Sequence, residues 1–417
     1  MKHIHESDAP AGRQAASAPY RWWVLTAAVT AQTTAAVATQ GIGVLGGFLQ
    51  ADLQLSHASV GVLAGVLNVA PIVGLMLAGE WLDRAGERRV IGMGALIMAL
   101  AMTLAGITTT FPGLLFCLFF VGIGYSTAQP GGTKAVFHWF PVRERGLAMG
   151  VRQAGLPLGG VVAAALFPGI ASHIGWQAAF LVGASVIVSG GALFCLVYRS
   201  SPGVASRHGS AESPQQPWLL YARRLLTAPR FRLAVVAGVA LITVQTVALM
   251  FLSLYLRDRF GLPLVAGTGH LLVMQLFGAA GRVLLAAWSD KIRHGRPLIV
   301  LITAVGSLLG LCALGLFPGH WSPDLLYLAS AWLGFFGFGW YGPWVAWISE
   351  LSPRHRLGTT LGLAMAINQV AIAGSPILFG CLVDVFGNYA VPGGLLATSL
   401  LIYIAYAGLR MLKREGV

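Results

Sequence analysis

Charged residues are scarce in this chain, and acidic residues are the scarcest. Asp, Glu, Lys and Arg make up 10% of the 417 residues, with 14 acidic against 27 basic side chains. Soluble domains carry about 25% charged residues, so this composition argues against a soluble protein. Apolar residues instead make up 56% of the chain, which is typical of a protein whose helices contact lipid.

Cysteine is also rare, and its placement indicates no chemistry. The four cysteines fit neither a disulfide framework nor a metal-ligand spacing. The sequence also lacks a nucleophile elbow and a phosphate-binding loop. We therefore predict a protein that is not an enzyme and that has no catalytic residues, no cofactor and no metal.

Apolar stretches long enough to cross a bilayer recur along the whole chain. About 20 residues suffice for one helical crossing, and twelve such stretches are present, which predicts an all-α membrane protein. We place the spans at 22–49, 57–80, 90–110, 112–137, 144–168, 176–198, 231–255, 264–289, 297–317, 324–349, 357–383 and 390–411.

The net charge of +13 reflects membrane topology. If the amino terminus is cytoplasmic, only Arg257 and Arg259 among the 27 Lys and Arg fall outside. Cytoplasmic loops are enriched in Lys and Arg, so we predict a multi-pass protein of the inner (cytoplasmic) membrane with both termini in the cytoplasm. Nucleic acid is not an expected partner.

The longest connection between spans divides them into two sets of six. It contains "SSPGVASRHGSAESPQQP", which reads as a flexible linker, followed by "WLLYARRLLTAPRF", which suits an interfacial helix. The sequence thus predicts a cytoplasmic tail at 1–20, a six-helix bundle at 21–199, a cytoplasmic linker with an interfacial helix at 200–229, and a second six-helix bundle at 230–412.

The two halves share a motif. "GEWLDRAGERR" (79–89) follows the second span and "AAWSDKIRHGR" (286–296) follows the eighth. The first resembles the loop 2–3 signature G-x-x-x-D-R-x-G-x-R-R of the major facilitator superfamily. This resemblance implies two six-helix bundles around a central cavity that opens alternately to each side of the membrane. It implies that the third, sixth, ninth and twelfth spans face lipid.

The resemblance also implies a gating role for the motif residues, which would steady the outward-open state from the cytoplasmic side. Glu350 either pairs with the second motif or lies at a solvated helix end. The gating residues implied in this way are Gly79, Asp83, Arg84, Gly86, Arg88 and Arg89 in the first copy, and Asp290, Lys291 and Arg293 in the second.

Charges inside the spans point to the substrate. No carboxylate falls in the middle of a span, whereas Arg152 and Arg282 lie about 10 and 12 Å from the cytoplasmic ends of their helices at 1.5 Å per residue. Two guanidiniums at one cavity would bind an anion, since the planar guanidinium pairs with a carboxylate bidentately. Two alternatives stay open: Arg152 could snorkel to the cytoplasm, and Arg282 could be structural.

A second resemblance concerns the eighth span. "GAAGRVLLAAWSD" is similar to the corresponding span of the oxalate and monocarboxylate transporter branches, among the organic-anion porters, in which the position of Arg282 binds substrate. Four further side chains are predicted to contact the substrate: Gln275, Tyr341, Asn368 and Gln129. Lys134 and His270 are interpreted as interfacial residues, although His270 could couple proton movement.

These observations predict a secondary active transporter of a small organic anion, a mono- or dicarboxylate, working by alternating access in the lipid bilayer. We expect a monomer. Proton symport, exchange for a counter-anion and facilitated diffusion all stay open. The alternative is an exporter of neutral or amphiphilic compounds, in which the aromatic residues around Tyr341 and Trp344 line the cavity and both arginines are structural. A membrane enzyme or sensor is a third, weaker interpretation.

Overall fold

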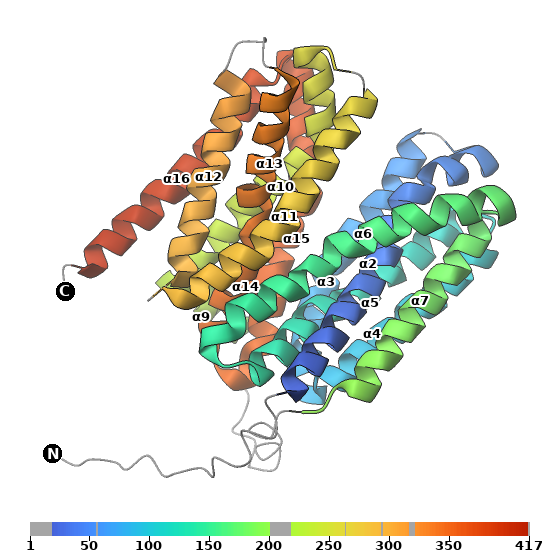
Figure 1. Cartoon of the computed structure of the whole chain (residues 1–417). Coiled ribbons are helices and arrows are strands. Elements are labelled where there is room, and N and C mark those ends of the chain that lie inside the picture. The colour runs from blue at the N-terminus through green and yellow to red at the C-terminus, as the bar shows by residue number, and fades with distance from the viewer. Residues whose placement is uncertain are drawn as a thin grey trace.

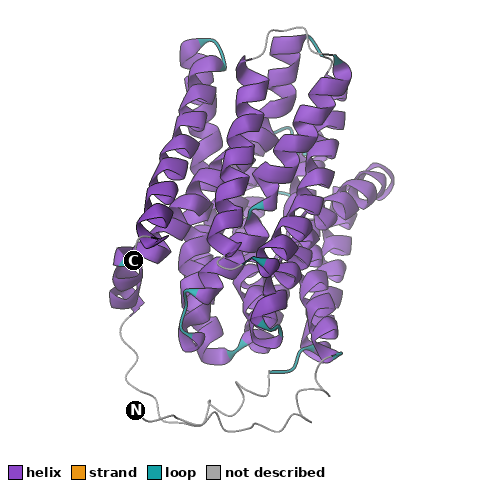
Figure 2. Ribbon diagram, turned by 60° about the vertical axis from the view of Figure 1, so that its left-hand side comes forward, coloured by secondary structure: helices purple, strands orange, loops and turns teal. Residues whose placement is uncertain are grey.

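The computed structural model describes residues 19–55, 57–200, 218–262, 264–292, 295–316 and 322–415. All regular structure in these residues is helical, with no strand (Figure 2). The predicted all-α fold is therefore confirmed. The first half consists of α2 (Tyr20–Asp52), α3 (His57–Ala85), α4 (Glu87–Ile107), α5 (Phe111–Trp139), α6 (Arg145–Ile174) and α7 (Trp176–Val197).

The second half also supplies six spans, and one of them is broken. Pro343 lacks the N–H that would bond to the carbonyl of Gly339, so the tenth span divides at Trp340 into two helices. The helices are α10 (Pro229–Phe260), α11 (Leu264–Lys291), α12 (Gly295–Leu316), α13 (Pro323–Gly339), α14 (Tyr341–Glu350), α15 (Leu357–Phe386) and α16 (Ala390–Glu415).

Most of these helices can cross a bilayer by themselves. Ten of those in the described ranges are long and apolar enough. The helix α2 is not among them because Gln32, Gln40 and several threonines make it more polar. The helices α13 and α14 are each short, at 17 and 10 residues, because of the break between them. With α2 and the joined α13–α14, the predicted twelve spans are complete.

The two halves lie side by side (Figure 1). The main contacts between them come from α3, α5 and α6 of the first half and from α11, α14 and α15 of the second. In contrast, α4 and α7 lie toward one outer edge, and α12 and α16 toward the other (Figure 1). This arrangement agrees with the expectation that the third, sixth, ninth and twelfth spans face lipid.

A short helix marks the end at which the halves meet. The helix α9 (Trp218–Thr227) falls within the predicted linker, where an interfacial helix was expected, and its end of the molecule is named the α9 side. Its Tyr221 shares a hydrogen bond of 3.0 Å with Thr360 at the start of α15.

One apolar core extends through the second half and includes Val24, Leu75 and Met149 of the first half. The rest of the first half has a separate core.

Candidate substrate site and gate

Arg152 lies on α6 and is fully buried inside the first half. Its Nη1 donates to Thr133 Oγ1 at 3.0 Å, and its Nη2 donates to Gln32 Oε1 at 2.9 Å. The same Nη2 also lies 2.8 and 2.7 Å from the carbonyl oxygens of Ala128 and Gln129, so its two N–H groups are shared among three acceptors. The guanidinium therefore connects α6 with α5 and α2. It does not snorkel to water, which was one of the two roles that the sequence left open.

Arg282 lies on α11, where the second half meets the first, and its side chain is 4% exposed. Its Nε donates to the carbonyl oxygen of Phe338 at 3.3 Å, and its Nη1 donates to that of Gln153 on α6 at 3.1 Å. A guanidinium has five N–H donors. Arg282 thus keeps donors for a ligand. Both Nη atoms of Arg152 donate within the protein, and its buried Nε has no hydrogen-bond partner among the described residues.

The two guanidiniums have neutral phenols and no acidic partner near them in the described residues. Both lie close enough to the phenols of Tyr125 and Tyr341 to interact with them electrostatically. In the part of the chain that the structure describes, no carboxylate lies within ion-pair distance of either one. Since an unpaired buried charge costs several kcal/mol, an anion would be strongly favoured at this place.

Gln129 on α5 and Tyr341 on α14 connect the two halves beside Arg152. The hydroxyl of Tyr341 donates to Gln129 Oε1 at 3.4 Å, and Gln129 Nε2 donates to the hydroxyl of Tyr125 at 3.2 Å. Since the Gln129 carbonyl also accepts from Arg152, these residues form one cluster. The structure therefore brings together four of the six predicted substrate residues, namely Arg152, Arg282, Gln129 and Tyr341.

The other two predicted substrate residues lie outside this cluster. Gln275 is half-buried on α11 and makes no hydrogen bond to any described residue. Asn368 on α15 is 2% exposed, and neither Oδ1 nor Nδ2 has a hydrogen-bond partner among the described residues. A buried amide without partners is costly, so Asn368 has hydrogen-bonding capacity to offer. Contact of either residue with a substrate stays a prediction.

Two polar residues near the arginines were not identified from the sequence. Thr133 accepts from Arg152, and Gln153 is 1% exposed with an unpartnered Nε2. Polar side chains inside apolar spans tend to hydrogen-bond between helices. That tendency was the only available signal, and it does not identify the partner.

The large aromatic residues near Tyr341 fill the core of the second half. Trp340 and Trp344 are fully buried. Their Nε1 atoms donate to Gln245 Oε1 at 3.1 Å and to the carbonyl oxygen of Ala234 at 2.6 Å. Both indoles are therefore occupied by packing and hydrogen bonds within their own half.

Glycines near the arginines let helices pack closely. A Cβ on Gly155 would lie 2.9 Å from Thr33 Oγ1 of α2, and one on Gly278 would lie 2.8 Å from the Phe338 side chain of α13. The space beside both glycines is therefore occupied by a neighbouring helix.

On the α9 side, Asp83 joins the first half to the second. It accepts from the backbone N–H groups of Gly358 and Thr359 at 2.8 and 2.7 Å, and from Thr359 Oγ1 at 2.7 Å. These groups form the first turn of α15, where unpaired N–H groups and the helix dipole favour an anion. Lys134 on α5 adds an ion pair to Asp83 at 3.0 Å.

Asp290 makes the reciprocal contact. It lies on α11 and accepts from the backbone N–H groups of Gly146 and Leu147 at 2.9 and 2.8 Å, in the first turn of α6. Arg296 pairs with Asp290 and, at 3.2 Å, with Glu350. The pairing of Glu350 with the second motif is thus observed. Each half places one carboxylate on a helix N-terminus of the other half.

The remaining motif residues behave differently from the two aspartates. Gly79 lets α3 approach α15, since a Cβ there would lie 2.5 Å from the carbonyl oxygen of Gly358. Gly86 turns the chain with φ of 79° before α4. Arg84 pairs with Glu80 on the exposed surface. Arg88, Arg89 and Lys291 are exposed, and Arg293 lies outside the described residues.

Two basic residues are not interfacial, so that interpretation is wrong for both. The Lys134 side chain is 8% exposed, because α5 packs on α3 and brings Nζ to Asp83 and to the carbonyl oxygen of Leu82, the latter at 2.7 Å. His270 is 2% exposed, and its Nδ1 lies 3.0 Å from Ser330 Oγ on α13.

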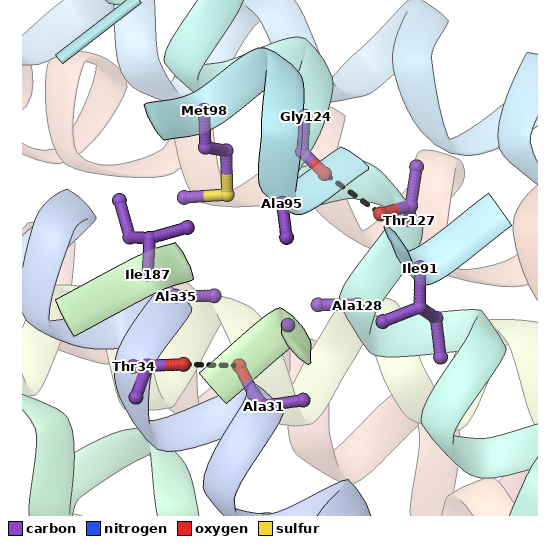
Figure 3. Close-up of a pocket in the computed structure, with 11 residues that line it drawn as sticks. Ala31, Thr34, Ala35, Ile91, Ala95, Met98, Gly124, Thr127, Ala128 and Ile187 are labelled. Atoms are coloured by element: carbon purple, nitrogen blue, oxygen red, sulfur yellow. Dashed lines mark hydrogen bonds between the residues drawn. The ribbon is translucent and has the colours of Figure 1, made fainter. Parts of the chain in front are cut away.

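A small cavity lies inside the first half (Figure 3). Its volume is about 10 Å³, and its lining includes Ala31, Ala35, Met98 and Ala128. A cavity needs at least about 10–15 Å³ to hold one water molecule. This space is therefore a packing void and not a substrate site.

The two six-helix halves contact each other on the α9 side, and two guanidiniums are buried inside them. This architecture defines a multi-pass membrane transporter. The model of the Major Facilitator Superfamily matches residues 28–376, and the chain belongs to this superfamily. As a member of this superfamily the chain is a transporter and not an enzyme.

The chain is similar to the probable sulfoacetate transporter SauU of Cupriavidus necator, with 25% identity over 378 residues that cover 84% of each chain. It is 26% identical over 345 residues to the 3-(3-hydroxy-phenyl)propionate transporter of Escherichia coli, covering 82% of each. The crystal structure of FucP in the outward conformation matches with a TM-score of 0.73 at 14% identity, covering 93% of this chain and 98% of FucP. This last likeness concerns the fold alone.

Proposed function

We propose that this protein is a secondary active transporter of a small organic anion, a mono- or dicarboxylate, and that Arg282 is the main substrate-binding residue. The observation that carries the proposal is the pair of buried guanidiniums without a carboxylate partner in the described part of the chain. Arg282 also lies between the halves and has donors to spare. The names of the two similar transporters, for sulfoacetate and a hydroxyphenylpropionate, support an organic anion.

Alternating access would use the two reciprocal aspartate contacts as the gate on the α9 side. We propose that this side is cytoplasmic, that the protein lies in the inner membrane as a monomer, and that Gly79, Asp83 and Asp290 steady the state open to the opposite side. The proposed domains are the bundles 21–199 and 230–412, with the tail 1–20 and the linker 200–229. The coupled ion would be a proton or a counter-anion.

Export of neutral or amphiphilic compounds is less well supported. That function needs aromatic side chains that are accessible to the substrate. Trp340 and Trp344 are fully buried, which leaves Tyr341 as the accessible aromatic residue of this group. The function would also leave the cost of two unpaired buried cations unexplained.

Uptake of labelled carboxylates into proteoliposomes tests the proposal. We expect wild type to take up at least one mono- or dicarboxylate, and Arg282→Gln to lose it. A hydrogen bond to a charged group contributes about 1.5–3 kcal/mol, so binding should weaken by about 10- to 150-fold. Arg257→Gln is the matched control, because this exposed arginine lies at the other end of the second half.

Undiminished uptake by Arg282→Gln would remove that residue from the site. If wild type moved a neutral amphiphile and no carboxylate, and the arginine variants moved it equally well, the exporter function would replace this proposal.

A further inference from the structure

A second cavity lies in the second half, away from the arginine cluster. It has a volume of about 260 Å³ and lies toward the end opposite the α9 side. Its walls come mainly from α10, α12 and α16, and α13 and α15 each contribute one lining residue. The lining is almost entirely apolar, and includes Phe251, Leu252, Leu314, Leu333, Phe379 and Leu396.

Three glycines form a recess in the wall of this cavity. Gly315 on α12 and Gly393 and Gly394 on α16 all line it, and a Cβ built on any of them would meet no atom within 4 Å. Protein interiors are normally packed as densely as organic crystals. An unfilled apolar space gives up the dispersion contacts of its lining, so an apolar ligand is favoured here.

One end of the cavity has polar and charged groups beside it. Tyr389 lines the cavity, and its hydroxyl donates to Asp258 at 2.9 Å, while Asp258 pairs with Arg257. Burial raises the pKa of Tyr389 to about 12, so the phenol stays protonated and keeps donating. Arg259 is exposed, makes no ion pair to a described residue, and lies close enough to Tyr255 of the lining to interact with it electrostatically.

We propose that this cavity binds one acyl chain of a membrane phospholipid, whose phosphate group contacts Arg259. The walls α12 and α16 are peripheral helices (Figure 1), so lipid tails surround them in the membrane. The apolar lining suits a hydrocarbon chain, and an unpaired guanidinium suits a phosphate. The site is separate from the proposed substrate site and does not depend on which compound is transported.

Photolabelling of the full-length chain in lipid nanodiscs tests this site. The probe is phosphatidylglycerol with a diazirine in one acyl chain. We expect label in residues 251–255 and 311–315 of wild type. Gly394→Leu should remove most of it, because the new side chain fills the recess. Gly408→Leu is the matched control: it lies on the same helix, it also has open space around its Cβ, and it is not in the lining.

Arg259→Gln tests the contact with the phosphate. It should reduce labelling by photoactivatable phosphatidylglycerol, and leave labelling by a photoactivatable diacylglycerol unchanged. Equal labelling of wild type and Gly394→Leu would overturn the acyl-chain site. Equal loss of both probes in Arg259→Gln, or no loss of either, would overturn the role of the phosphate. Complete displacement of the phospholipid by a medium-chain alcohol would show that the occupant is a small amphiphile.

Discussion

Arg152 and Arg282 both place a positive charge inside the membrane spans, but their hydrogen bonds indicate different roles. Arg152 is bonded to Gln32, Thr133 and two carbonyl oxygens within the first half. Arg282 contacts one carbonyl oxygen in each half. We infer that Arg152 holds its own half together and contributes charge to the site, while Arg282 contacts the substrate.

Loss of Arg152 should therefore lower stability as well as transport. Arg152→Gln removes hydrogen bonds between a charged donor and buried acceptors, each contributing about 1.5–3 kcal/mol. We expect a clear drop in the temperature of thermal unfolding of the purified protein in detergent. Arg282→Gln, with fewer bonds to lose, should unfold nearer to wild type. Equal unfolding temperatures of wild type and Arg152→Gln would contradict this division.

Lys134 and Asp83 should be energetically coupled. Breaking a buried ion pair by removing one partner costs about 3–5 kcal/mol, because the other charge stays buried. Lys134→Met and Asp83→Asn should each destabilise the protein, and the double variant should cost less than the sum. A double-mutant cycle on unfolding free energies measures this, with an expected coupling of about 0.5–3 kcal/mol. Strict additivity would mean that the pair is not coupled.

The sequence predicts that Arg152 and Arg282 lie inside membrane spans, but not which groups hold them. An arginine in an apolar span is conspicuous because charge there is costly. The hydrogen-bond partners of this arginine are not conspicuous in the sequence. Gln32 and Arg152 lie 120 residues apart and come together only through helix packing. The same reason explains the error at Lys134, which lies 51 residues from Asp83.

At the scale of helices, α3 and α15 pack so closely that their contact can hold the two halves together on the α9 side and so act as a gate. A Cβ on Gly358 would lie 2.4 Å from the carbonyl oxygen of Gly79, and one on Gly362 would lie 2.3 Å from that of Leu75. Backbones this close leave no room for side chains. Any larger residue must therefore push the two helices, and with them the two halves, apart.

Gly362→Val should open the α9 side. Overpacking of this kind costs about 1–3 kcal/mol, and separation of α3 from α15 relieves it. Spin labels on Arg84→Cys and Lys291→Cys, in a background without the native cysteines, should report a longer distance across the α9 side. Gly374→Val is the control on the same helix, since open space surrounds its Cβ. An unchanged distance in Gly362→Val would argue against this contact as a gate.

Hydropathy predicts the number of spans correctly, but the span bounds that it predicts differ from the helix bounds in the structure. The helix α6 continues to Ile174 and α10 to Phe260, beyond the predicted ends at 168 and 255. Backbone hydrogen bonds continue a helix past the apolar stretch, and hydropathy does not register this. The break at Trp340 falls where Pro343 lacks the N–H that would bond to the Gly339 carbonyl, and hydropathy does not predict it, since α3, α5, α6 and α15 contain prolines and stay unbroken.

For the whole molecule, the distribution of basic residues predicts its orientation. Alkaline phosphatase fused to the carboxyl terminus should be inactive, and green fluorescent protein fused there should fluoresce, because that terminus should be cytoplasmic. Phosphatase fused after Phe260, beyond Arg257 and Arg259, should be active. The reverse pattern would place the α9 side outside and invert the proposed gate.

The buried guanidiniums also have an electrical consequence. With no carboxylate partner in the described residues, the unoccupied site carries positive charge, which a bound dianion would neutralise and a monoanion would halve. Moving one elementary charge across a membrane potential of 100 mV changes its free energy by about 2.3 kcal/mol. For a dicarboxylate, voltage would therefore act mainly on the return of the empty carrier, so the valence of the cargo would decide which half of the cycle is electrogenic.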